Sequence, residues 1–202
     1  MNVDNVKLIG ISGKARSGKD SLEKAMRKLD GKQRRMLFAE PIKQMLLVMT
    51  AGNLPLEPGG GSDDYDKNAL VPGFDKTLRF MMQTLGTDWG RNTIDPEIWI
   101  KVADKYLYGS CCQPDRVVYT DVRFDNEAQF IRDHNGIIVE ISRYDRDCID
   151  NANHSSEHGI NPGLVDMFLL NNGPISDLDI MAKNILNKFD TIIALRRKLN
   201  VS

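Results

Sequence analysis

Cysteine is scarce in this sequence, with only three residues among 202. Two of them, Cys111 and Cys112, are adjacent, which does not fit the ligand spacing of a zinc site. The third is Cys148, and an odd total argues against a framework of disulfide bonds. We therefore interpret the cysteines as reduced structural thiols.

A strong charge of one sign and a long hydrophobic run are also missing. The formal net charge is -1, so overall electrostatics do not favour binding to nucleic acid or to an anionic membrane. No apolar stretch approaches the roughly 20 residues of a membrane span. The first residues lack the basic-then-apolar layout of a secretory signal. We expect a cytoplasmic protein (in the host cytoplasm if it is viral) that binds neither nucleic acid nor membrane, and that holds any anion through local geometry.

What the sequence does contain is an alternation of short apolar runs with amphipathic segments. Such an alternation predicts an α/β fold with a central parallel sheet and helices on both faces. We expect one domain over residues 1–202, with a surface loop in the glycine-rich stretch 53–67. The predicted strands are residues 6–12, 36–39, 117–120, 137–141 and 168–170, and the predicted helices are residues 21–29, 41–49, 76–85, 96–107, 126–134 and 177–199.

The most specific motif lies between the first predicted strand and the first predicted helix. Residues 13–19, Gly-Lys-Ala-Arg-Ser-Gly-Lys, match G-x-x-x-x-G-K in the structural context that a phosphate-binding loop requires. The glycines allow backbone angles that a Cβ would resist, successive N–H groups can bind phosphate oxygens, and Lys19 can reach the β- and γ-phosphates. The motif predicts an ATP site formed by Gly13, Lys14, Ser17, Gly18, Lys19, Asp20 and Ser21.

Asp20 departs from this motif, because it stands where serine or threonine usually provides a hydroxyl to magnesium. Its carboxylate could bind the ion directly or through water, or could orient the acceptor, and Ser21 could provide the hydroxyl instead. Asp121 follows the apolar run 116–120, at the carboxyl end of a predicted parallel strand, where α/β proteins form ligand sites. We predict Asp121 and Asp20 as the residues that hold Mg²⁺.

Four blocks in the sequence resemble the deoxynucleoside monophosphate kinases of bacteriophages: residues 17–21 (SGKDS), 38–43 (FAEPIK), 83–91 (QTLGTDWGR) and 120–128 (TDVRFDNEA). The resemblance implies a three-layer P-loop kinase fold that uses ATP with magnesium. It also implies transfer of the γ-phosphate of ATP to a deoxynucleoside monophosphate, which gives the diphosphate for DNA precursor synthesis. Phage members of this family often form dimers, so a homodimer stays open for this chain.

The acceptor phosphate needs cations besides Lys19, and the resembling blocks contain suitable ones. We place the acceptor-binding region at about residues 40–108, with a lid at about residues 143–162 that excludes water. Arg143, at the start of the lid, is predicted to act in catalysis together with Lys19 and Asp20. The predicted acceptor-binding residues are Lys43, Arg79, Gln83, Arg91 and Arg123, with Phe38 and Trp89 beside the base.

Two alternative functions share parts of this pattern. The phosphomevalonate kinases of animals contain a similar Ser-Gly-Lys-Asp turn, although the block 89–91 favours a nucleotide acceptor. Residues 154–158, His-Ser-Ser-Glu-His, match the H-x-x-E-H signature of zinc peptidases, but the surrounding residues are typical of a loop, which favours a polar lid. Base preference, the strictness of the demand for 2′-deoxyribose and the oligomeric state stay open.

Overall fold

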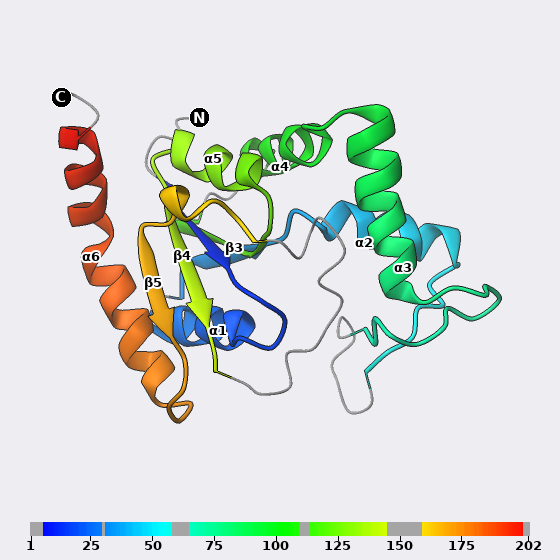
Figure 1. The fold of residues 1–202 in the computed structure, drawn as a ribbon, viewed down its shortest axis with the longest axis horizontal. Coiled ribbons are helices and arrows are strands. Elements are labelled where there is room, and N and C mark those ends of the chain that lie inside the picture. The colour runs from blue at the N-terminus through cyan, green and yellow to red at the C-terminus, as the bar shows by residue number, and fades with distance from the viewer. Residues whose placement is uncertain (1–5, 30, 58–64, 110–113, 145–158, 200–202) are drawn as a thin grey trace. The chain divides into compact units, whose positions relative to one another are not determined.

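The structure of the protein is a computed structural model, which describes residues 6–29, 31–57, 65–109, 114–144 and 159–199. The chain divides into two compact units (Figure 1). The first unit consists of residues 1–37 and 108–202, and the second consists of residues 38–107.

The first unit contains a five-stranded sheet in which all neighbouring strands are parallel. This arrangement confirms the predicted α/β class. The strand order is β2-β3-β1-β4-β5, so β1 lies in the centre and the loop after it opens at the carboxyl edge of the sheet. The strands are β1 (Lys7–Ser12), β2 (Gln33–Met36), β3 (Arg116–Val122), β4 (Ile137–Ser142) and β5 (Met167–Leu170).

Helices cover both faces of this sheet, as the sequence predicted. On one face, α1 (Lys19–Leu29) and α6 (Asp177–Leu199) pack on alternate strand residues such as Ile9, Ile11 and Val118. On the other face, α5 (Asp125–Asp133) brings Ile131 so close to Gly10 that a Cβ there would lie 2.6 Å from Ile131 Cδ1. The result is a three-layer unit with its core on both sides of β1, β3 and β4.

Long apolar stripes explain why these helices lie where they do. In α6, the buried residues Leu178, Ala182, Ile185 and Phe189 recur at helical spacing and form one continuous face. At its last turn, Arg196 donates to Asp166 Oδ2 at 2.5 Å, and the same carboxylate oxygen accepts the N–H of Ile138 at 2.7 Å. The stripe and this polar contact fix the end of α6 beside the start of β4.

The second unit is helical. Its helices are α2 (Glu40–Met49), α3 (Leu78–Gln83), a π-helix η2 (Thr84–Ile94) and α4 (Ile98–Tyr108). Pro41 lies in the first turn of α2, where its missing N–H costs no hydrogen bond. The core of the unit contains Ile42, Leu46, Leu54, Val71, Leu78 and Trp99.

The sequence misplaced one strand and did not predict the π-helix. β2 covers residues 33–36 instead of 36–39, because its pairing with β3 uses the polar run Gln33–Met36 rather than the apolar residues that follow. After α3, the chain widens into η2 where Trp99 packs against Gly90 and donates Nε1–H to the Gly86 carbonyl at 2.7 Å. The indole ring of Trp99 thus contacts the π-helix at two of its glycines.

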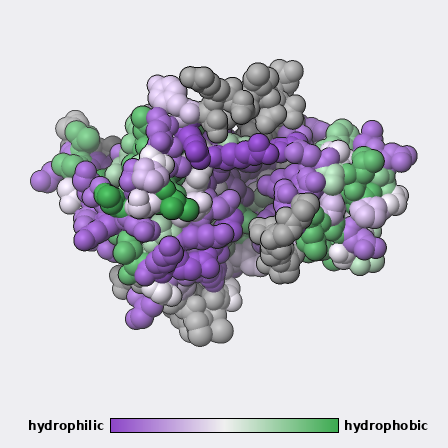
Figure 2. Space-filling model, turned by 90° about the horizontal axis from the view of Figure 1, so that it is seen from below, coloured by the Kyte–Doolittle hydropathy of each residue, from purple (hydrophilic) through white to green (hydrophobic). Residues whose placement is uncertain are grey.

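Figure 2 shows hydrophobic residues as separate groups among hydrophilic ones on the face it displays. Within the described parts of the chain, none of the helices is long and apolar enough to cross a membrane. Residues 145–158, which include most of the predicted lid and the whole H-x-x-E-H match, lie outside the described residues, as do Cys111, Cys112 and Cys148.

Candidate nucleotide site

The loop between β1 and α1 contains three residues with positive φ, a backbone feature typical of an anion-binding nest, in which successive N–H groups face a common concavity. Gly13, Arg16 and Gly18 have φ values of 139°, 61° and 105°. At Gly13 a Cβ would lie 2.2 Å from the Ile141 carbonyl oxygen of β4, so no side chain fits there. Arg16 adopts a left-handed conformation that is unfavourable for a residue with a Cβ, as is common at ligand sites.

Lys19, the first residue of α1, lies over this loop. Its Nζ donates to the carbonyl oxygens of Gly13 at 2.7 Å and of Lys14 at 2.6 Å. The ammonium group therefore sits at the opening of the nest, next to the positive end of the α1 dipole. This combination of N–H groups, dipole and ammonium is suited to a polyphosphate.

A pocket of 510 Å³ adjoins the loop. Its lining comes from the loop and the first turn of α1, from the residue after β4, and from the connection between β5 and α6. The residues are Arg16, Gly18, Lys19, Asp20, Ser21, Arg143, Asn171, Gly173, Pro174, Ile175 and Leu178. The pocket thus places predicted phosphate-binding residues beside the apolar side chains of Pro174, Ile175 and Leu178.

The structure brings together most of the predicted ATP-site residues and adds one that the sequence did not indicate. Asn171, the residue after β5, is buried and donates Nδ2–H to the Ser17 carbonyl at 2.9 Å, while its own N–H donates to the Ser142 carbonyl at 2.8 Å. A Cβ on Gly18 would lie only 2.4 Å from Asn171 Nδ2, so a larger residue does not fit at this position. Asn171 therefore holds the loop against the end of the sheet.

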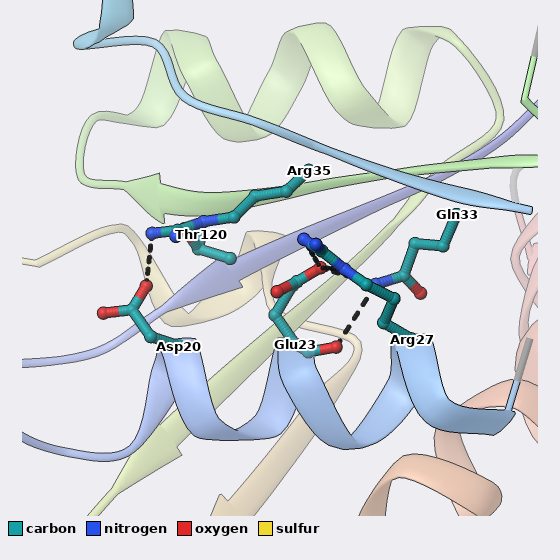
Figure 3. A network of polar contacts seen from close by, with 6 residues as sticks. All are labelled: Asp20, Glu23, Arg27, Gln33, Arg35 and Thr120. Atoms are coloured by element: carbon teal, nitrogen blue, oxygen red, sulfur yellow. Dashed lines mark hydrogen bonds and ion pairs between the residues drawn. The ribbon is translucent and has the colours of Figure 1, made fainter. Parts of the chain in front are cut away.

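A second polar contact that the sequence did not indicate involves Asp20 (Figure 3). Arg35 of β2 donates Nη2–H to Asp20 Oδ1 at 2.5 Å and Nε–H to Thr120 Oγ1 at 3.1 Å. Thr120 precedes Asp121 in β3, so the guanidinium connects the first turn of α1 to the strand that contains the other predicted magnesium ligand.

The Asp20 carboxylate near the loop is compatible with magnesium that binds together with a nucleotide. Among the described residues, no group of three or more His, Cys, Asp or Glu side chains could hold a metal ion. Asp20, a hard carboxylate, lines the pocket beside Lys19. Magnesium bound with a nucleotide takes most of its ligands from phosphate and water and needs only one or two carboxylates.

The predicted acceptor-binding residues are divided between the two units. Arg123 and the catalytic candidate Arg143 belong to the first unit, and the others belong to the second. Arg79 in α3 donates Nε–H to Asn68 Oδ1 at 3.1 Å, and Gln83 ends the same helix. Lys43 lies in α2, Trp89 is exposed on η2, and Phe38 is buried.

Arg91 is also buried, and it donates to the Pro96 carbonyl at 3.2 Å. Their roles toward an acceptor stay predictions.

A parallel sheet with helices on both faces, and a lysine over the loop after its central strand, are consistent with the fold of a P-loop kinase. A family model described as deoxynucleotide monophosphate kinase matches residues 72–181, more than half of the chain. The chain belongs to this family, and the match confirms the predicted resemblance. The matched region begins after the phosphate-binding loop, so the two lines of evidence come from different parts of the sequence.

A relative of known function is the deoxynucleoside-5′-monophosphate kinase of Escherichia phage T5. It is 31% identical to this chain over 87 residues, which are 41% of this chain and 34% of the relative. The aligned stretch therefore spans about a third of the length of that relative.

Proposed function

We propose that the protein is an ATP-dependent deoxynucleoside monophosphate kinase, which transfers the γ-phosphate of ATP to a deoxynucleoside monophosphate and so provides a diphosphate for DNA precursor synthesis. The observation that carries this proposal is the nest after β1 with Lys19 over it, in a chain of the deoxynucleotide monophosphate kinase family.

The donor nucleotide is proposed to bind along the first unit. The N–H groups of the nest bind its phosphates, and Lys19 exchanges its contacts with the Gly13 and Lys14 carbonyls for contacts with phosphate oxygens. The nucleoside part occupies the 510 Å³ pocket, whose lining includes Pro174 and Ile175. Arg143, in the same lining, adds positive charge on the side of the predicted lid.

Magnesium, when bound, supplies positive charge to the β- and γ-phosphate oxygens, and Asp20 and Asp121 are the residues proposed to hold it. Phosphoryl transfer requires positioning and charge stabilisation more than covalent chemistry by the protein. The acceptor is proposed to bind to Lys43, Arg79, Gln83, Arg91 and Arg123, with Phe38 and Trp89 beside its base.

The test is an assay that couples ADP release to a measurable signal, with a panel of deoxy- and ribonucleoside monophosphates and with phosphomevalonate as acceptors. We expect turnover with at least one deoxynucleoside monophosphate and none with phosphomevalonate. Turnover with phosphomevalonate alone would contradict the proposed identity of the acceptor but not the proposed ATP site.

Lys19→Ala tests the ATP site itself. We expect kcat to fall about 100-fold or more, because the substitution removes a cation that stabilises charge in the transition state. Lys24→Ala is the matched control, since Lys24 is an exposed lysine on the same helix and does not line the pocket. Full activity of Lys19→Ala, with both variants folded by circular dichroism, would contradict the proposed function.

A further inference from the structure

Arg35 connects three elements at the edge of the proposed magnesium site. It is the third residue of the four-residue strand β2, and its guanidinium donates to Asp20 on α1 at 2.5 Å and to Thr120 on β3 at 3.1 Å. Figure 3 shows the contact of Arg35 with Asp20 and the position of Thr120 beside the Arg35 side chain. A planar guanidinium that donates through two different nitrogens is fixed in direction as well as in position.

We propose that Arg35 is a positioning residue, which turns Asp20 toward the pocket so that the carboxylate can hold magnesium or its water shell. This inference rests on the proposed function. The ion pair uses Asp20 Oδ1, whereas Oδ2 makes no hydrogen bond or ion pair with the described residues. Asp20 also lines the pocket beside Lys19. Arg35 thus occupies one oxygen of the carboxylate and leaves the other available to the cation.

Orientation matters here because the Asp20 side chain is 63% exposed. Without a partner, an exposed aspartate in the first turn of a helix can rotate into solvent. Groups that hydrogen-bond to a metal ligand fix its direction, and their loss typically weakens metal affinity by about 10–100-fold. Arg35 fixes the direction of Asp20 in this way, and Thr120 in turn fixes the direction of the Arg35 guanidinium.

A purely structural role, in which the ion pair only attaches α1 to β2, is less consistent with the neighbouring contacts. One turn further along α1, Glu23 is buried and accepts from Gln33 of β2 at 2.9 Å and from Arg27 at 2.6 Å (Figure 3). That attachment does not involve Arg35. Ion pairs between exposed groups add little to stability, so the protein should stay folded when the pair between Arg35 and Asp20 is removed.

The test measures cation binding rather than turnover. Mn²⁺ in place of Mg²⁺ is titrated by electron paramagnetic resonance into protein saturated with a non-hydrolysable ATP analogue. We expect Arg35→Gln to weaken Mn²⁺ binding about tenfold. Arg27→Gln is the matched control, because it removes an arginine–carboxylate pair of similar length from the same helix, and we expect it to bind Mn²⁺ within about twofold of the wild type.

Two further variants separate orientation from charge. Arg35→Lys keeps the charge but lacks the planar group that reaches both partners, so we expect weakened binding. Thr120→Val removes only the Oγ1 acceptor, and we expect a smaller loss in the same direction. The double variant Asp20→Asn/Arg35→Gln should bind no more weakly than Asp20→Asn alone, because Arg35 acts through Asp20.

Unchanged or tighter Mn²⁺ binding by Arg35→Gln would overturn the inference, because Arg35 would then not help Asp20 to hold the cation. Wild-type binding by Arg35→Lys would also overturn it, because only the charge of residue 35 would then matter. Additive losses in the double variant would also overturn it. Failure of the proposed function looks different, because wild-type protein would then show no affinity for the ATP analogue with or without the cation.

Discussion

At the scale of single residues, the loop that we propose to bind phosphate is supported by contacts from outside the motif. Gly13 lies against the Ile141 carbonyl of β4, and Ser17 receives the amide of Asn171 from the end of β5. The two contacts hold the first and the later part of the loop against neighbouring strands. A preorganised loop binds an anion without the cost of ordering its backbone at the moment of binding.

Asn171→Ala should therefore weaken ATP binding while the protein stays folded. The substitution removes the donor to the buried Ser17 carbonyl, and an unsatisfied buried acceptor costs about 1–3 kcal/mol. Since this cost falls on the loop, we expect the KM for ATP to rise about tenfold and the KM for the deoxynucleoside monophosphate to change little. Steady-state kinetics with each substrate varied in turn measure this difference.

Asn184→Ala provides the matched control for that experiment, because Asn184 is an exposed asparagine of the same unit, on α6. It should leave both KM values unchanged. An equal rise of both KM values in Asn171→Ala would mean that the residue supports the fold as a whole rather than the loop.

Contacts between residues that are close in the sequence could be predicted, whereas contacts between distant residues could not. The place of Gly13, Gly18 and Lys19 between a strand and a helix could be predicted from the sequence, because one short motif contains the strand end, the turn and the helix start. Asn171 is 154 residues from Ser17, and Arg35 is 85 residues from Thr120. These residues are brought together only by the order of the strands in the sheet. The sequence around Asn171 or Arg35 contains no motif that indicates these contacts.

At the scale of elements, periodicity predicted the helices and strands of the first unit well, because their buried faces are continuous. The stripe of α6 and the apolar runs of β1, β3 and β4 show this clearly. β2 is different, since it is a short edge strand of polar residues whose Gln33 and Arg35 contact α1. Of the apolar residues that suggested a strand at 36–39, Met36 ends β2, and the others belong to the turn and to the start of the second unit.

In the π-helix η2, we expect a glycine-to-alanine substitution to lower stability, which is the opposite of what helix propensity predicts. Alanine in place of glycine usually stabilises a helix interior by about 1 kcal/mol. In Gly90→Ala, however, the new Cβ would lie 2.6 Å from Trp99 Cζ2 and 3.0 Å from the Leu85 carbonyl oxygen. Overpacking of this kind costs about 1–3 kcal/mol, so we expect a net loss of up to about 2 kcal/mol in the free energy of unfolding.

Urea unfolding followed by circular dichroism measures this loss. Gly31→Ala is the control, because a Cβ at Gly31 meets no atom within 4 Å, and we expect it to change stability by less than about 0.5 kcal/mol. If Gly90→Ala were more stable than the wild type, the close packing of Trp99 on η2 would be refuted.

At the scale of the whole molecule, the proposed donor and acceptor functions are assigned largely to different units. The nest, Lys19 and the 510 Å³ pocket belong to the first unit, whereas most predicted acceptor-binding residues belong to the second. The family match covers residues of both units, from 72 to 181. The sequence indicated the acceptor region only through its resemblance to the family, because the helices of the second unit carry no motif as specific as the phosphate-binding loop.

This division can be tested with the natural tryptophans, since both Trp89 and Trp99 lie in the second unit. Trp89 is exposed on η2, whereas Trp99 is buried with its Nε1–H bound to the Gly86 carbonyl. We expect a deoxynucleoside monophosphate to change the tryptophan emission in a saturable way, because Trp89 is predicted to flank the base. A non-hydrolysable ATP analogue alone should change it much less, because the proposed donor residues belong to a unit without tryptophan.

Trp89→Phe identifies the source of the signal. It keeps an aromatic ring for stacking, and it leaves Trp99, whose shielded indole should not respond to the acceptor. We therefore expect the emission change to disappear in this variant while the KM for the monophosphate changes only slightly. A full emission change in Trp89→Phe would place the responding group at Trp99, and an equal response of wild-type protein to the ATP analogue would contradict the assignment of donor and acceptor to separate units.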